Sequence, residues 1–558
     1  MRKYVFVILS VVIISGLVIS GLIFGSCSEP ATTTAPAAKT SAPATTTTAP
    51  AATTSAPAKT TSPVTTSSPA APGIQTQTGG TLRVIINSTT RNIGDPGSTG
   101  INGRSLFVEP LTLFDTKGNL IPWLAESWDL NPTAKTMTFK LKRGVKFHDG
   151  TDFNAAAVKW NWEQQSAIGR ITGSADLKSM EVVDDYTIKL TFNRFSALYI
   201  FAYTHSIPMF SPTAVQKNGK DWARTHAVGT GPFKQADFKP DSYFKLVRYD
   251  GYWSTKPYLD GIDQTVVSDA TVAGLTMRKK DADMWDSANL MEGMQLKDEG
   301  YQVIQRRAMI NFLAMDSGNP KSIFSNIKVR QAVEYAIDRN ALAAVRGFGG
   351  AYEPIFQFAT PTDKGYNPNI AVRNYDPQKT RQLLAEAGYP DGIKTKMICA
   401  NDQTTIDTCT LLQAYLRAAG ITVELDPADT ARRQSMVAPG GTGWTDALVY
   451  GGVGVNAGLD YVRWTIANTF TTQPKGWYSS VIKTPAFSTL YDQMVTVPSL
   501  EEAEAIGMKM VKQIYDDVMV IPLFNSPYTL VAQKYVHTNF LSVHHMIWNP
   551  ELDWMEKH

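Results

Sequence analysis

This sequence of 558 residues has little net charge and few histidines. The formal net charge is +3, and it falls to +1 if Arg2 and Lys3 leave with a signal segment, which gives no support for nucleic acid or an anionic surface as a partner. The seven histidines are scattered apart from His544 and His545, and no His-Glu-x-x-His occurs. We therefore expect no protein-built catalytic metal site and no cofactor.

Charged side chains are absent from Tyr4 to Cys27, directly after the basic start of the chain. A short positive segment followed by a long apolar one is typical of an export signal, so residues 1–26 are interpreted as a signal peptide. The residues Phe24-Gly25-Ser26-Cys27 are similar to a bacterial lipobox, although Phe24 replaces the usual aliphatic residue. The alternative is an uncleaved transmembrane anchor, because the apolar run is long enough to span a bilayer. Both interpretations place the rest of the chain on the outer face of the membrane.

Apolar side chains are scarce in the next segment, residues 27–78, which consists almost wholly of Thr, Ala, Pro and Ser. Such a composition cannot offset the entropy of ordering, and its prolines favour an extended backbone. At about 3.1 Å per residue this linker can reach well over ~100 Å. We interpret it as a disordered tether, and its Ser and Thr content is equally compatible with a glycosylated stalk.

Aromatic residues are abundant, with 12 Trp, 22 Tyr and 23 Phe, and the hydrophobic fraction of 43% predicts a folded protein with at least two large cores. The central stretch, residues 120–161, contains an alternating strand with Phe139, Leu141, Val145 and Phe147. It then turns at residues 148–150 and enters a helix capped by Asn154. Taken alone, these patterns predict an ordinary α/β scaffold.

The whole stretch resembles the signature of the family 5 extracellular solute-binding proteins of ABC transporters, the dipeptide, oligopeptide and nickel-binding group. The matching residues are Pro122, Leu124-Ala125-Glu126-Ser127-Trp128, Phe139 to Gly150, and Ala155 to Val158. Further blocks that resemble the family are Gly79 to Ile86, Val228 to Phe233, Arg248 to Trp253, Val329 to Arg339 and Val520 to Phe524. The resemblance covers about residues 80–558.

This resemblance implies a two-lobed α/β fold with a ligand cleft between the lobes. We expect lobe I over residues 79–310 with a subdomain at about 105–227, lobe II over 311–522, and a return to lobe I over 523–558. Asp376, Pro377 at the first helical position and Gly388 just past the end predict a capped helix. Residues 395–400, 404–419 and 421–425 read as a strand, a helix and a strand, and so predict a parallel βαβ unit. The implied function is to capture a solute outside the cell and to deliver it to an ABC permease, as a monomer and without catalysis.

An exported hydrolase acting on peptides or cell-wall material is the alternative from another class. Ser325 and Lys328 fit a Ser-x-x-Lys pattern, but no Lys-Thr-Gly occurs and Ser is a common helix cap. Gly452, Gly454 and Gly458 miss the spacing of a dinucleotide-binding loop. These patterns therefore do not favour an enzyme.

The resemblance also suggests where the ligand binds. Peptide-binding members carry an Asp in the second lobe that pairs with the ammonium group of the peptide. Here Asn456 takes that place, or Asp460 does if the loop carries an insertion, and the sequence leaves both alignments open. The first alignment would remove the anion and disfavour an ordinary free peptide. The candidate ligand-binding residues are Ser98, Thr99, Trp444, Tyr450, Asn456, Asp460, Phe524 and Asn525.

The sequence contains three cysteines, so two thiols remain once Cys27 is assigned to lipidation. Cys399 and Cys409 lie close in the sequence of an exported chain, so they form a candidate disulfide. The alternative is a pair of buried apolar thiols, and the choice depends on geometry that the sequence does not give.

The lipid assignment gives a first test. We expect Cys27→Ala to abolish incorporation of a labelled fatty acid, because the thiol is the acceptor of the acyl group. The measurement is metabolic labelling followed by gel autoradiography, with Cys399→Ala as the matched control that keeps its label. Retained labelling of Cys27→Ala would show that the lipobox is misplaced.

Overall fold

The computed structural model describes residues 76–89, 92–97, 105–115, 117–438, 440–455, 458–471, 476–539 and 549–557, and of Trp464 and Asn468 only the backbone. The signal segment, Cys27, most of the linker, Ser98, Thr99 and Asn456 lie outside these residues. Residues Ile74–His558 form one compact unit. None of the helices in the described ranges is long and apolar enough to cross a bilayer.

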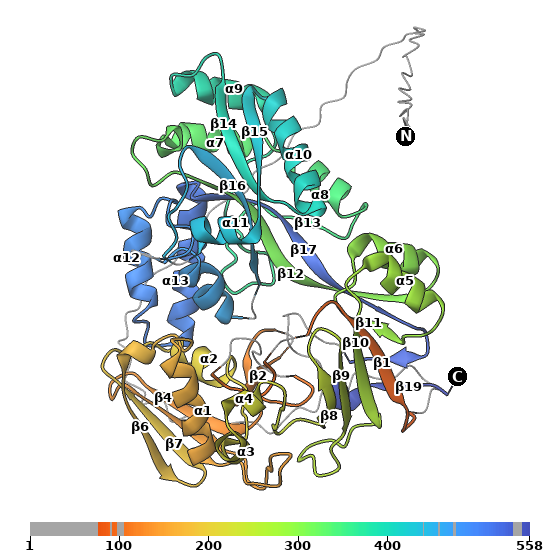
Figure 1. Cartoon of the computed structure of the whole chain (residues 1–558). Coiled ribbons are helices and arrows are strands. Elements are labelled where there is room, and N and C mark those ends of the chain that lie inside the picture. Colours follow the sequence, from red (N-terminus) through yellow and green to blue (C-terminus); the bar gives the residue numbers. More distant parts are fainter. Residues whose placement is uncertain are drawn as a thin grey trace, which may run out of the picture. The chain divides into compact units, whose positions relative to one another are not determined.

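A mixed sheet of eleven strands organises this unit (Figure 1). Its strands in spatial order are β15 (Ile421–Ala428), β14 (Ile393–Ala400), β16 (Ala447–Gly454), β12 (Gln302–Met315), β17 (Val520–Ala532), β11 (Met284–Trp285), β1 (Thr81–Ile86), β10 (Gly261–Val266), β9 (Tyr243–Arg248) and β8 (Phe233–Lys239), with β13 (Glu353–Pro354) pairing with β17. The strands β1 and β8 to β11 belong to lobe I, and β14 to β16 belong to lobe II. The fold is therefore the two-lobed α/β arrangement that the sequence predicts.

The strands β12 and β17 are the two chain crossings between the lobes. They pair antiparallel along nearly their whole length, from Gln302 opposite Ala532 to Ala314 opposite Val520. The register shifts between Arg307 and Met309 and again between Asn311 and Phe312, and such bulges bend and twist a strand pair. The lobe boundaries expected at 310/311 and 522/523 fall inside these two strands.

Helices cover both halves of the sheet, and a smaller sheet builds the subdomain (Figure 1). The α-helices are α1 (Ala155–Ala167), α2 (Tyr199–Thr204), α3 (Pro212–Asn218), α4 (Lys220–Ala223), α5 (Ala270–Arg278), α6 (Leu290–Asp298), α7 (Ile327–Tyr335), α8 (Arg339–Arg346), α9 (Pro377–Glu386), α10 (Gln403–Ala418), α11 (Thr430–Val437), α12 (Pro485–Met494) and α13 (Leu500–Asp516). A π-helix spans Tyr461–Asn468. The subdomain sheet has the order β4 (Ala125–Asn131), β5 (Thr136–Leu141), β7 (Thr187–Phe192) and β6 (Leu177–Asp184). The pairs β2 (Thr112–Phe114) with β3 (Leu120–Pro122) and β18 (Val536–His537) with β19 (Trp554–Met555) complete the strands.

Several local predictions are confirmed. The side chain of Asn154 accepts from the amide of Ala157 at 3.0 Å and caps α1, and Asp376 caps α9 with Pro377 at its first position. The strands β14 and β15 are parallel and joined by α10, as the βαβ pattern predicts. One prediction is wrong: the alternating strand ends at Leu141, because Gly144 takes a positive φ of 75° and turns the chain, although Phe147 is still buried.

A buried carboxylate, Glu109, holds four separate parts of lobe I together. Its Oε1 accepts hydrogen bonds from Trp123 Nε1 at 2.9 Å and from the Tyr252 hydroxyl at 2.8 Å. Its Oε2 accepts from the Thr230 hydroxyl and from Trp253 Nε1, both at 2.9 Å. Hydrogen bonds to an ionised acceptor are about twice as strong as neutral ones, so these bonds compensate the cost of burying the charge.

His148 links the turn at residues 148–150 to the segment that carries Thr230. Its Nε2 lies 2.9 Å from the Gly231 carbonyl, and its Nδ1 accepts from the Gly229 amide at 3.3 Å. Since Nδ1 accepts, the ring is neutral, and burial lowers the pKa of His148 to about 4. This histidine is therefore structural, as the sequence indicates.

The two thiols lie in one core. Cys399 ends β14, Cys409 lies in α10, and both are free and fully buried. The neighbouring Cys399 thiol and burial together raise the pKa of the Cys409 thiol. The disulfide stays a prediction that this proximity favours.

The carboxylate Glu109 gives a stability test. We expect Glu109→Gln to destabilise the protein by about 3 kcal/mol, because each oxygen of Glu109 holds one indole N–H, and an amide NH₂ in either orientation must face one of them. The measurement is the urea midpoint followed by fluorescence. Glu181→Gln, on an exposed position of β6, is the control and should change stability by less than about 0.5 kcal/mol. Equal midpoints for the two variants would contradict the assigned role.

The cysteine pair gives a test of the predicted disulfide. Peptide mapping of the exported protein without reducing agent is expected to yield one linked peptide that contains Cys399 and Cys409, because the two thiols lie in the same buried cluster. Recovery of both as free thiols would refute the bridge.

Candidate functional site

The parallel strands of both lobes point toward the centre of the ribbon formed by β12 and β17. In lobe I, Trp285 at the end of β11 pairs with Val531, and β11 runs toward the centre of β17. In lobe II, Gly454 at the end of β16 pairs with Met309, and β16 runs toward the centre of β12. We call residues 306–311 of β12 and 524–529 of β17 the junction. In open α/β sheets ligands bind beyond the carboxyl ends of the strands, so both lobes offer a binding edge at the junction.

Polar side chains occupy the junction. The Tyr450 hydroxyl donates to Asn311 Oδ1 at 2.9 Å, and Asn311 Nδ2 donates to Ser526 Oγ at 2.9 Å. Asn525 is 2% exposed, and its Oδ1 has no hydrogen-bond partner within the described part of the chain. Buried acceptors are almost always satisfied, so such an atom indicates a functional position.

A hollow of about 310 Å³ lies on the lobe I side, at the carboxyl ends of β1 and β11. Its polar lining consists mainly of Asn87, Thr89, Ser105, Gln264, Asp286 and Ser287. The aromatic wall is made of Phe107, Phe238 and Phe244. The candidate ligand residues Ser98 and Thr99 lie in the sequence between two lining residues, Thr89 and Ser105.

The carboxyl group of Asp286 is the charged group of this hollow. Burial raises its pKa, and the hydroxyl of Tyr528, from the junction, donates to its Oδ1. The next residue, Ser287, has a positive φ of 59°, which is unusual for a residue with a side chain, and its carbonyl accepts from Asn87 Nδ2 at 2.8 Å. Backbone strain of this kind clusters at functional sites.

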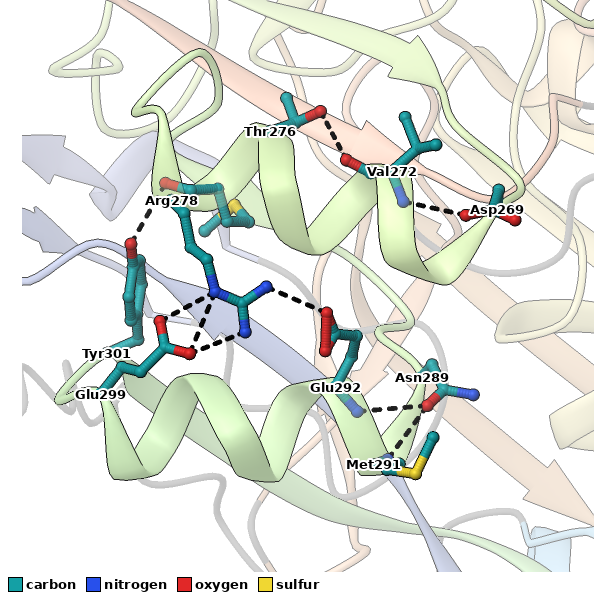
Figure 2. Close-up of polar contacts among 10 residues, drawn as sticks. Asp269, Val272, Thr276, Arg278, Asn289, Met291, Glu292, Glu299 and Tyr301 are labelled. Atoms are coloured by element: carbon teal, nitrogen blue, oxygen red, sulfur yellow. Dashed lines mark hydrogen bonds and ion pairs between the residues drawn. The ribbon is translucent and has the colours of Figure 1, made fainter.

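Helices α5 and α6 lie before and after Asp286 in the sequence, and Figure 2 shows the polar contacts that join the two helices. Arg278 on α5 donates to Glu299 at 2.7 Å and to Glu292 at 3.0 Å, both on or just after α6. The hydrogen bonds from Arg278 lower the pKa of Glu299. Asn289 caps α6 by accepting from the Met291 amide at 3.0 Å. The positions of Asp286 and Ser287, between β11 and α6, are thereby fixed from both ends.

The sequence-predicted ligand residues occupy different environments. Trp444 lies in the core with its Nε1 donating to the Ala447 carbonyl at 3.2 Å, and Phe524 stacks on Tyr352 at 4.8 Å. Tyr450 and Asn525 lie at or against the junction. Sequence reasoning missed Asp286, because one Asp after a two-residue strand carries no local signal.

Asp460 forms a buried ion pair. Its Oδ1 accepts from Arg463 Nε at 2.5 Å, and the two side chains are 3% and 6% exposed. Arg463 also donates to Thr172 at 3.0 Å, so this pair connects lobe II to the subdomain of lobe I. The charge of Asp460 is therefore balanced by a residue of its own chain.

The enzyme patterns have structural explanations. The Ser325 hydroxyl donates to the Ser322 carbonyl at 2.7 Å, and Lys328 pairs with Glu386 at 3.0 Å. Gly452 lies inside β16, where a Cβ would come within 2.5 Å of Met309 Sδ. Within the described ranges no group of three or more His, Cys, Asp or Glu side chains is placed to hold a metal ion.

Two lobes joined by two strands, with a polar edge at their junction, define a solute-binding protein. Residues 119–487 match the model of the bacterial extracellular solute-binding proteins, family 5. The chain belongs to this family, whose members are binding proteins of ABC importers.

The named relatives share 29% to 30% of their residues with this chain over the matched regions. The chain is 30% identical over 379 residues to the glutathione-binding protein GsiB of Pectobacterium atrosepticum, a match that covers 66% of this chain and 72% of the relative. The GsiB protein of Shigella flexneri is 29% identical over 401 residues, covering 68% and 75%.

Solved structures share the fold. NikA from Brucella suis, in complex with Fe(III)-EDTA, has a TM-score of 0.74 at 19% identity and covers 85% of this chain and 100% of its own. DppA from Helicobacter pylori, in complex with the peptide STSA, has a TM-score of 0.68 at 24% identity and covers 86% and 99%.

Proposed function

We propose that this protein is a lipid-anchored receptor on the outer face of the cytoplasmic membrane that delivers a small peptide-like solute to an ABC permease. The observation that carries the proposal is that parallel strands of both lobes point toward one polar junction. Relatives with glutathione and a peptide in their names support the solute class.

The size and chemistry of the hollow support a small solute with both polar and apolar parts. A volume of about 310 Å³ lies at the lower end of the range for small-molecule sites. Its amide, hydroxyl and carboxyl groups fit the amide groups of a peptide, and its aromatic wall fits apolar side chains. The buried acceptor of Asn525 adds one more group that a bound amide N–H would satisfy.

The proposal also includes that the receptor is lipid-anchored and monomeric. The segment before Cys27 supplies the export signal, Cys27 is the lipid acceptor, and the linker gives the folded unit reach toward its permease. The exported hydrolase is the rival function, but Ser325 and Lys328 each have a structural partner and do not contact one another in any recorded bond.

The test is ligand-induced stabilisation without turnover. The full chain is mixed with a library of di- to pentapeptides and, separately, with glutathione, and its melting temperature is measured. A ligand at 100 times its Kd stabilises the folded state by about 2.7 kcal/mol, so binders are expected to raise Tm by a few degrees. Mass spectrometry of the mixture should return the peptides intact.

Asn525→Leu is the matched variant. It removes the unsatisfied acceptor without loss of a hydrogen bond in the protein, so we expect unchanged Tm of the free protein and a smaller ligand-induced shift. Multiple-turnover cleavage of the peptides would overturn the receptor proposal and favour the hydrolase, and no shift with any library member would overturn the peptide-like class.

A further inference from the structure

Among the described residues, the carboxyl group of Asp286 has no counter-charge. In the part of the chain that the structure describes, no Lys, Arg or His forms an ion pair with this carboxyl group, and its partners are the Tyr528 hydroxyl and the Ser287 backbone. An unpaired carboxylate with restricted access to water costs free energy, which proteins retain mainly where it serves a function.

The neighbouring Asp283 shows the contrast. Its carboxylate accepts from Arg83 at 2.6 Å and from the Tyr535 hydroxyl at 2.8 Å. Burial acts to raise the pKa of Asp283, but these hydrogen bonds outweigh it and the pKa is lowered. Asp283 is therefore a structural ion pair, and Asp286, three residues later, differs in having none.

Other charged groups around Asp286 are already engaged or point elsewhere. On α5 and α6, Arg278 is paired with Glu292 and Glu299. On β12, Arg306 lies opposite Tyr528, and its Nη1 donates to the Gln305 carbonyl at 2.9 Å. None of these groups neutralises Asp286, which faces the hollow instead.

We propose that Asp286 receives the ammonium group of the bound solute, so that the anion of this site comes from lobe I. The hollow at Asp286 has room for such a group, and its described lining carries no Lys, Arg or His. In lobe II, Asp460 is already paired with Arg463, so it has no charge to offer a ligand without losing that partner. The proposal rests on the receptor function and names the chemical class of its solute as a primary amine.

Binding depends on pH in a defined direction. Because the pKa of Asp286 is raised in the folded state, the contribution of this group to the stability of the free protein falls as pH rises above the ordinary Asp value of 3.8. Solute binding has the opposite dependence, because the ammonium pairs with the ionised carboxylate. We expect affinity to fall as the pH is lowered from 7 and Asp286 becomes protonated.

The experiment compares three forms of the full chain: wild type, Asp286→Asn and Asp460→Asn. Each is titrated by calorimetry at pH 7 with the peptide library, with the same library N-acetylated, and with simple alkylammonium ions. The wild type is expected to bind free amines at least ~10-fold more tightly than acetylated ones, as one lost charge-assisted contact of about 1.4 kcal/mol implies. Asp286→Asn should lose this preference, and Asp460→Asn should keep it.

Stability measurements separate loss of binding from loss of folding. At pH 7, Asp286→Asn is expected to melt at the same or a higher temperature than wild type, because it removes an unpaired carboxylate. Asp283→Asn is the matched control and should melt lower, because it breaks the pair with Arg83.

The outcomes distinguish the two proposals. Binding that is unaffected by acetylation or by Asp286→Asn overturns this inference and leaves the receptor function standing. Binding of alkylammonium ions alone, dependent on Asp286, supports the inference and overturns the peptide-like class. No binding of any probe overturns both.

Discussion

One buried carboxylate fixes the interior of lobe I. Among the described residues, Glu109 accepts hydrogen bonds from side chains that are 14, 121, 143 and 144 residues away in the sequence. Four segments must therefore be in place before the charge is compensated, and each of them also enters the apolar packing around it. His148 adds a neutral link from the turn at residues 148–150 to one of these segments, the one that carries Thr230. This arrangement makes the order of lobe I cooperative, since no single contact satisfies the charge alone.

The junction depends on this rigid interior. The strands β1 and β11 can aim their ends at the centre of β17 only because the sheet behind them is held in register, with Ile85 opposite Trp285. Two groups at that edge are incompletely compensated by the described residues. The side-chain oxygen Oδ1 of Asn525 has no hydrogen-bond partner, and the Asp286 carboxylate has no ion pair. A binding site requires polar groups that are fully hydrogen-bonded in the interior and polar groups at the edge that still lack a partner.

Much of the fold is predictable from the sequence, because local rules decide it. The Asn154 cap, the Asp376-Pro377 helix start and the parallel β14-α10-β15 unit follow from side-chain chemistry and periodicity. The site is less predictable, because it depends on long-range pairing. Nothing near Asp460 in the sequence distinguishes a ligand partner from the ion pair with Arg463, and only the three-dimensional neighbours of Asp283 and Asp286 separate a structural carboxylate from an uncompensated one.

The paired strands β12 and β17 have a mechanical consequence. A two-stranded ribbon with hydrogen bonds along its length resists stretching and sliding, but it twists and bends at low cost, most easily where bulges interrupt its register. Any motion of one lobe against the other must then be close to a rotation about this ribbon, with one angle as its main coordinate. A permease that contacts both lobes would need to sense only that angle to tell a loaded receptor from an empty one.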